Sequence, residues 1–431
     1  MADQNKGMSD LWRRLRFVFM AIVVYRMGTH IPIPGIDPTR LAALFDQNQG
    51  TILEMFNLFS GGALERMSIF ALNVVPYISS AIIMQLFSNS IPYLQELKKD
   101  GQAGRNQITQ YTRYGTVILA FIQASALAVT LGASGLAYEP GTSFFISAVF
   151  SVVAGTIFLM WLGELISERG IGNGISIIIA TSILTGIPGA IGQALEQARQ
   201  GDLNILLLLG IGVLAMLVIA VVVFIERGQR RITVNYAQRQ QGRKLMQAQA
   251  SHLPFKVNMA GVIPAIFAST FLLFPASLST WFGQAESFGF LQTISLALNP
   301  GQPLYILTFS ALIISFCFIW LALTFDTKAV TDNLKKSGGF VPGIRPGEQT
   351  AAYVDSVLAR LTVFGSIYLT LICLLPLGLI NFAGVSFYLG GTSVLIIVVV
   401  LMDFMSQVQS HMMSSQYSSL LKKANLKNYS K

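Results

Sequence analysis

Few residues of this chain are of a type that could catalyse a reaction or bind a metal, and they are scattered. Its 431 residues include three isolated histidines, His30, His252 and His411, and two cysteines, Cys317 and Cys373. The patterns HExxH and GxSxG and the phosphate-binding P-loop are missing. Both cysteines fall in apolar stretches, so we predict buried free thiols and no disulfide. We expect no catalytic residue, no metal site and no cofactor.

Polar side chains inside apolar stretches are the remaining candidates. Asn73, Ser79, Gln123, Ser176 and Asn258 each interrupt such a stretch. In a membrane these residues usually form hydrogen bonds between helices, worth about 0.6 kcal/mol each. Glu164 and Asp403 lie at the predicted cytoplasmic ends of their stretches, and the interiors lack the Asp, Glu and Lys residues that ion-coupled transporters use as proton or sodium relays. This pattern favours a passive conduit over a coupled carrier.

The elements that must position these residues are membrane spans. The chain is 53% hydrophobic and 11% charged, whereas a soluble domain carries about 25% charged residues. Its apolar blocks are roughly 18–23 residues long, which suits a bilayer core about 30 Å thick. We predict an all-α polytopic protein, with ten spans near residues 17–32, 67–91, 115–133, 144–165, 174–191, 203–225, 257–278, 304–325, 357–379 and 385–402.

The distribution of positive charge predicts the topology. With these spans, 25 of the 29 Lys and Arg residues fall on the side of the N-terminus. The opposite side keeps only Arg40, Arg66 and Arg199, and Arg26 lies within the first span. Because Lys and Arg are retained in cytoplasmic loops, we expect both termini in the cytoplasm.

Residues 57–91 break the simple pattern, because they are too long for one span. The interruptions are Gly61 with Gly62, the pair Glu65 and Arg66, and Asn73 with Pro76. We interpret the segment as a short half-helix followed by a full span. A charged pair is costly in lipid, so the half-helix should occupy a water-filled or protein-lined cavity. The alternative is an interfacial helix on the outer surface.

Two long cytoplasmic loops, about residues 227–256 and 326–356, are candidates for partner binding. In the first, the alternation of Ile232, Val234 and Tyr236 predicts a strand. In the second, glycines and prolines predict a stiff turn around Arg345. Loops of this length are usually functional. Their basic residues also suit topology and anionic-lipid contacts.

Eight stretches, in this order, resemble those of the SecY family of protein-conducting channels, and the likeness covers nearly the whole chain. They are residues 31–37 (IPIPGID), 59–64 (FSGGAL), 110–115 (QYTRYG), 168–177 (ERGIGNGISI), 226–231 (ERGQRR), 256–264 (KVNMAGVIP), 332–349 (DNLKKSGGFVPGIRPGEQ) and 390–393 (GGTS).

The resemblance implies one channel domain over residues 1–431, in two pseudo-symmetric five-helix halves, about 17–191 and 203–402. Such a channel moves unfolded secretory polypeptides across the bacterial inner membrane and releases transmembrane segments laterally into it. The resemblance also implies a narrow pore closed by a ring of aliphatic side chains, which resists wetting. Carried over by position, the ring is Val74, Ile78, Ile175, Ile179, Ile266 and Ile396.

The same resemblance assigns a plug, a lateral gate and docking residues. The half-helix around residues 57–67 corresponds to the plug, with Phe59, Ser60, Gly61, Gly62, Glu65 and Arg66. A gate between spans two and three and spans seven and eight would include Ser79, Gln123, Asn258 and Phe274. Docking of the ribosome or the ATPase SecA would use Arg243, Lys244 and Arg345.

The partners implied by the resemblance complete the expectation. They are SecE and SecG in a heterotrimer, SecA, the ribosome, SecD, SecF, YidC, signal peptides and nascent membrane proteins. Energy would come from SecA or the ribosome, so the chain itself would not be an enzyme. A solute carrier with a midplane site is the alternative from another class, but it requires a polar cluster that the spans lack. A membrane scaffold fits the loops but not the broken segment.

Arg345 provides a test of the docking role. If it only set topology, Lys would serve equally well, because either charge counts. If its planar guanidinium makes a bidentate contact with a carboxylate or phosphate, Lys should fail. We predict that Arg345→Lys and Arg345→Glu both impair translocation, while Lys335→Arg and Lys427→Glu are nearly silent. Export by Arg345→Glu near the unsubstituted level, at matched protein amounts and unchanged topology, would refute the docking role.

Overall fold

Helices dominate the chain in a computed structural model that describes residues 2–41, 57, 60–139, 141–201, 204–236, 240–241, 244–245, 250–282, 297–298, 302–383 and 391–428. The helices are α1 (Ala2–Gly28), α4 (Val75–Ser90), α5 (Pro92–Lys99), α6 (Gln102–Ala133), α7 (Thr142–Arg169), α8 (Gly174–Gln200), α9 (Ile205–Arg227), α10 (Ile263–Phe282), α12 (Pro303–Thr324), α13 (Thr327–Lys336), α14 (Glu348–Ala383) and α15 (Gly391–Asn428). The strands are β1 (Gln229–Tyr236), β2 (Gln240–Gln241), β3 (Lys244–Leu245), β4 (Ala250–Lys256) and β5 (Gly339–Phe340).

Seven helices of the described chain are long and apolar enough to cross a membrane. They are α6, α7, α8, α9, α12 with its continuation into α13, α14 and α15. The other three predicted spans overlap α1, α4 and α10. Of these, α4 has only 16 residues, and α10 has 20, with side chains described over its apolar stretch Ile263–Leu272. The chain is therefore a helical membrane protein with several spans.

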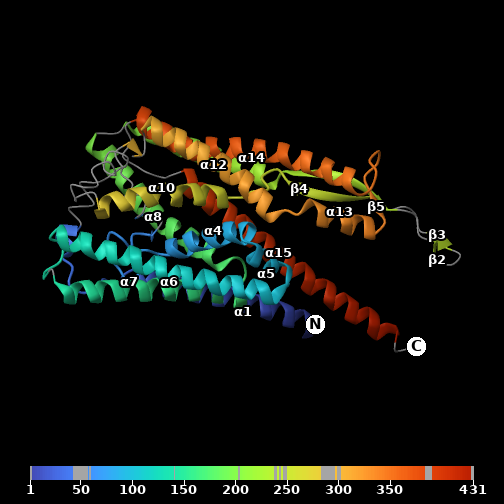
Figure 1. Ribbon diagram of the computed structural model, residues 1–431, viewed down its shortest axis with the longest axis horizontal. Helices are drawn as coiled ribbons and strands as arrows, with labels where there is room; N and C mark the ends of the chain where they lie inside the picture. The colour runs from blue at the N-terminus through green and yellow to red at the C-terminus, as the bar shows by residue number, and fades with distance from the viewer. Residues whose placement is uncertain are drawn as a thin grey trace.

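The long helices run roughly along one common axis (Figure 1). In this view α1, α6 and α7 lie along one side, α12 and α14 along the other, and α4, α8 and α15 lie between them. Both termini and the strands lie at the same end of the molecule, which we call the strand end.

A three-stranded antiparallel sheet, in the order β4-β1-β5, confirms the strand predicted from the first long loop. In β1 the side chains of Ile232 and Val234 are buried while their neighbours are exposed. Ile232 packs in a small core with Phe255 of β4 and with Val354 and Leu358 of α14. This core ties the β1–β4 hairpin to the second long loop, and the predicted turn of that loop directly follows β5.

Three predicted spans begin or end differently in the structure. The first ends at Gly28, not at residue 32, because the chain then pairs with the segment before α4: Ile33 N donates to Met67 O at 2.8 Å and Ile69 N to Ile31 O at 3.0 Å. This pairing delays the second span, which begins at Val75 instead of residue 67. The seventh begins at Ile263, not at residue 257, since residues 257–262 form bends and turns.

The predicted half-helix also stops earlier than expected. Ser60 is helical, but residues 61–74 run in turns. Gly61 and Gly62 have φ values of +68° and +78°, which a right-handed helix does not accommodate. The segment nevertheless stays inside the protein, because Ala63, Leu64 and Met67 are buried.

Close packing of α7 against the start of α8 places the first residues of α8. A Cβ atom on Gly174 would lie 1.9 Å from the Gly163 carbonyl oxygen, so only glycine allows this approach. Asn173 caps α8, with its Oδ1 accepting from Ile175 N at 3.1 Å. Cys317 of α12 and Cys373 of α14 are free and buried, as predicted.

Candidate functional site

A narrow cavity lies where the start of α4 meets α8 and α10. Its volume is about 20 Å³, which is room for about one water molecule. The lining residues are Asn73, Val74, Val75, Ile78, Ile179, Ile266, Ser269 and Thr270. Four of the six residues assigned to the aliphatic ring therefore line one cavity.

The hydroxyl groups in the lining of this cavity bond to their own helix. Ser269 Oγ donates to Ala265 O at 2.7 Å, and Thr270 Oγ1 donates to Ile266 O at 2.8 Å. Such i−4 bonds leave little donor capacity for water in the cavity. The walls formed by α4, α8 and α10 are therefore mainly aliphatic, and water gains little by entering them.

The other two ring residues, Ile175 and Ile396, do not line the cavity but belong to the same hydrophobic cluster. Ile396 of α15 is fully buried. Ile175 packs against α7 near Gly163, where a Cβ would lie 2.4 Å from its Cδ1 atom. The structure thus gathers all six residues in one cluster, and four of them line the small cavity.

A buried hydrogen-bond network beside the cavity holds the segment assigned to the plug. Tyr25 of α1 places its hydroxyl 2.6 Å from Ser182 Oγ of α8 and 3.2 Å from Ser60 O. Asn73 Nδ2 donates to the same Ser182 Oγ at 3.0 Å. Asn73 has a φ of +48°; Asn tolerates this region better than most residues. One serine therefore connects α1, α8 and both ends of the segment.

Charged residues of the plug segment lie on its exposed side. Arg26 Nη1 donates to Gly61 O at 3.2 Å. Glu65 accepts from Asn57 Nδ2 at 3.0 Å, and Arg66 Nη1 lies 3.3 Å from His30 Nε2. Glu65 and Arg66 are both exposed, so the fold does not bury this charged pair among apolar side chains. Phe59 lies outside the described residues.

An apolar seam runs between α4 and the pair α10 and α12. Side chains of Ile82, Gln85 and Leu86 from α4 share a small cavity with Phe267 of α10 and with four residues of α12, which are Phe316, Ile319, Trp320 and Leu323. Phe267 packs edge-on against Phe316 and Trp320, with ring centroids 5.9 and 5.6 Å apart. The sequence analysis did not identify these residues, because aromatic side chains are common in spans and the sequence does not show which of them pack together.

The polar residues assigned to the lateral gate are not joined by hydrogen bonds in the described chain. Ser79 Oγ donates to Val75 O of its own helix at 3.1 Å. Gln123 of α6 is buried, and its Oε1 atom has no partner among the described residues. Asn258 instead bonds to Glu226, a buried residue that the sequence analysis did not single out. The side chain of Phe274 lies outside the described part.

Two of the residues assigned to docking, Lys244 and Arg345, lie at or near the strand end. Arg345 is exposed, and the turn around it is closed by Thr350 Oγ1, which donates to Arg345 O at 2.8 Å. Arg345 forms no ion pair within the described chain. Lys244 belongs to β3, but its side chain lies outside the described part, as does Arg243. Exposure of Arg345 leaves its guanidinium available to a partner.

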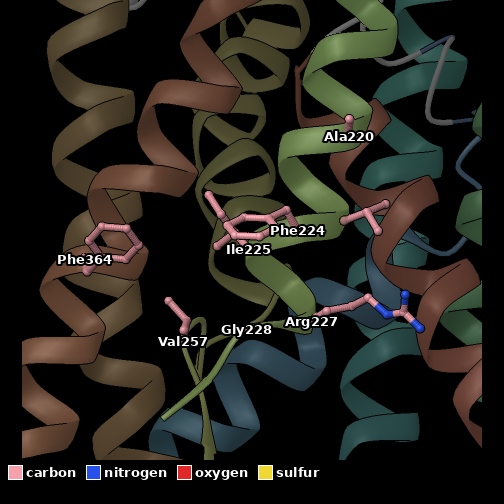
Figure 2. Close-up of a pocket in the computed structure, with 8 residues that line it drawn as sticks. Ala220, Phe224, Ile225, Arg227, Gly228, Val257 and Phe364 are labelled. Carbon is pink, nitrogen blue, oxygen red and sulfur yellow. The ribbon is translucent and has the colours of Figure 1, made fainter.

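A wider groove of about 750 Å³ lies between α9 and α14 near the strand end. Figure 2 shows Phe224 of α9 and Phe364 of α14 on its walls, with Gly228 and Val257 below and Arg227 extending away from Phe364. The groove shares no lining residue with the small cavity between α4, α8 and α10, so the two are separate features.

Solved structures with the same fold show the class of this protein. A structure described as that of a protein-conducting channel has a TM-score of 0.66 at 19% identity, and covers 94% of this chain and 93% of that one. Sec61 in a canine ribosome–channel complex has a TM-score of 0.62 at 18% identity, with the same two coverages. The fold is therefore that of the protein-conducting channels.

Sequence comparison then identifies the family. A family model described as SecY matches residues 68–405. The protein translocase subunit SecY of Pseudomonas aeruginosa is 64% identical over 428 residues, which cover 99% of this chain and 97% of the relative. That of Escherichia coli K12 is 59% identical over 427 residues, covering 98% and 96%. The chain belongs to the SecY family.

Replacing Tyr25 with Phe tests the network around Ser182. The variant keeps the ring, which stacks on Phe70, but removes the hydroxyl bonded to Ser182 and Ser60. Loss of a hydrogen bond worth about 1 kcal/mol should raise the equilibrium constant for local opening of the segment about fivefold. We predict that amide hydrogen exchange over residues 60–72 becomes faster by this factor. Tyr138→Phe, at an exposed tyrosine, is the control, and equal exchange rates in the two variants would contradict the assignment.

Proposed function

We propose that this chain is the pore-forming subunit of a translocase, which moves unfolded secretory polypeptides across the bacterial inner membrane and releases transmembrane segments laterally into it. Membership of the SecY family supports the class of function. The observation that carries the mechanism is the aliphatic cavity between α4, α8 and α10, because a pore for polypeptides must close without binding its cargo.

The proposed barrier works by exclusion of water. Branched aliphatic side chains at Val74, Ile179 and Ile266 line a space with room for about one water molecule. Hydrated ions would have to shed water there without gaining new ligands, so they cross slowly. The same side chains offer no directional bond to a passing polypeptide. Ile175 and Ile396 would join the ring when the helices around the cavity separate.

In this proposal the segment around residues 57–67 forms the plug, which closes the outer side of the barrier. Its support is the network through which Tyr25 and Arg26 of α1 bond the carbonyl groups of Ser60 and Gly61. Such contacts are individually weak, at about 1 kcal/mol each. A polypeptide entering the pore could therefore displace the segment without breaking a helix of the bundle.

The lateral gate would open along the seam between α4 and the pair α10 and α12. Apolar and aromatic contacts close this seam, including Leu86, Phe267 and Trp320. Replacing these contacts with an apolar signal segment costs little free energy, because one apolar surface is exchanged for another. Gln123 and Asn258, together with Ser79 and Phe274, are proposed as the polar residues that sense the segment.

The proposed topology has ten spans, in halves of about residues 17–191 and 203–402, with both termini in the cytoplasm. The concentration of Lys and Arg on one side supports this orientation. It agrees with Figure 1, where both termini and the strands lie at the same end.

Partners are proposed to dock at the strand end, on the loops 227–256 and 326–356. Two structures of this fold are described as a canine Sec61 and a yeast Ssh1 complex with ribosomes. Arg243, Lys244 and Arg345 would bind the ribosome or SecA, which would supply the energy, and SecE and SecG would complete the heterotrimer. The chain's net charge of +9 favours contact with RNA phosphates and anionic lipids.

Reconstitution tests the function as a whole. Vesicles that contain this chain with SecE should protect a signal-bearing precursor from protease when SecA and ATP are added. A precursor without its signal is the matched control and should remain accessible. Protection of the precursor without SecA would refute the proposed mode of transport.

Substitution of Ile78 by Asn tests the barrier. The amide of Asn73 already lines the cavity, with its Nδ2 atom donating to Ser182. A second amide, in place of an aliphatic side chain, would add a group that binds water, and a barrier lowered by about 1.4 kcal/mol corresponds to a tenfold faster crossing. We predict that resting ion conductance of reconstituted vesicles rises about tenfold in Ile78→Asn and in Ile179→Asn. Ile83→Asn, on the exposed side of α4, should leave the conductance unchanged. Equal conductance in all three would exclude this cavity as the barrier.

A further inference from the structure

A buried carboxyl group ends α9. Glu226 is 6% exposed and follows Val218 and Val222 on the buried stripe of the helix. A carboxyl group removed from water is costly unless it is hydrogen-bonded. Its position at the end of a span does not by itself explain why the Glu226 carboxyl group is buried, so its contacts must.

Its partner is Asn258, which is 2% exposed. Asn258 Nδ2 donates to Glu226 Oε1 at 2.7 Å and to Gly261 O at 3.2 Å. Gly261 has a φ of +63°, in the bend directly before α10. One amide group thus joins the end of α9 to the bend from which α10 starts.

This contact lies at the root of the β1–β4 hairpin. The first register pair of the hairpin is Gln229 with Lys256, and Val257 N donates to Gly228 O at 3.0 Å just below it. Figure 2 shows Gly228 and Val257 together at this root, next to Arg227. An ion pair of Lys256 with Asp403 at 3.5 Å also lies there, but both side chains are more than half exposed, so it contributes little. The buried bond is the stronger tie.

α10, the helix that starts after this hydrogen bond, carries residues of both the small cavity and the seam. Ile266, on the first turn of α10, lines the constriction. Phe267, its neighbour, packs against α12 and shares the seam cavity with α4. A displacement of the bend at residues 257–262 would therefore move the barrier and the seam together.

We propose that the Glu226–Asn258 hydrogen bond is the positioning contact that couples the β1–β4 hairpin to α10, so that a partner bound at the hairpin opens the seam. This inference rests on the proposed function and adds to it the residue pair that transmits docking. The contact requires an acceptor at residue 226, not a charge. A glutamine there supplies that acceptor, and its amide group can also donate to Asn258 Oδ1, which has no partner among the described residues.

If this contact couples the hairpin to α10, a variant that lacks it should still bind ribosomes but should no longer open the seam. A fluorophore on Leu86→Cys, in a background with Cys317 and Cys373 replaced by alanine, is quenched by Trp320 across the seam, and Trp320→Phe gives the unquenched reference. Ribosomes added to the vesicles should relieve the quenching in the parent protein. In Glu226→Met, whose side chain has similar length but no such acceptor, ribosome affinity should stay within twofold while the relief falls at least fivefold. Glu226→Gln should respond like the parent.

The double variant Glu226→Met with Asn258→Leu controls for stability, because replacing both partners with apolar side chains leaves no polar atom unpaired. It should fold, bind ribosomes and respond no worse than Glu226→Met alone, as expected for one shared contact. Full relief in Glu226→Met, or loss of ribosome binding in it, would overturn the coupling. A parent protein that binds ribosomes without any relief would instead overturn the proposed function, which keeps the two failures distinct.

Discussion

The hydrocarbon core of a membrane offers no hydrogen-bond partner to the backbone, and this constraint governs how the chain departs from helix. Two departures stand out among the described residues, 61–74 before α4 and 257–262 before α10. Both make hydrogen bonds within the protein. The first pairs with residues 31–33 through bonds such as Ile33 N to Met67 O, and the second is closed by Asn258 and by the bond from Val257 N to Gly228 O.

These irregular segments precede α4 and α10, which line the small cavity together with α8. Their bonds come from single side chains, chiefly Tyr25 with Ser182 and Glu226 with Asn258. Buried bonds of this kind give a defined position at a modest free energy, because most of their strength offsets lost hydration. Contacts that are specific but weak suit a gate. In the proposed channel, the aliphatic wall at Val74 and Ile179 would serve the complementary need, closing the pore without holding cargo.

Much of the fold could be predicted from the sequence because its signals are local. Block length and charge placement indicated the spans, and alternation of Ile232 and Val234 indicated β1, which the structure confirms. Errors arose where tertiary pairing overrides local pattern. The span expected from residue 67 begins at Val75, because residues 67–69 bond to residues 31–33 instead of continuing a helix. No periodicity in either segment announces such a pairing.

The sequence by itself determined the class of protein, its long helices and the cations at one end, because hydrophobic length and charge act on each segment alone. Only the tertiary structure decided which side chains meet. It gathered Val74, Ile179 and Ile266 around one cavity, and it gave Asn258 a buried carboxyl partner 32 positions earlier. The sequence pattern of an aliphatic residue in a span is the same whether the residue faces lipid, the protein core or the pore. The difference lies in how helices pack, which depends on many distant contacts at once.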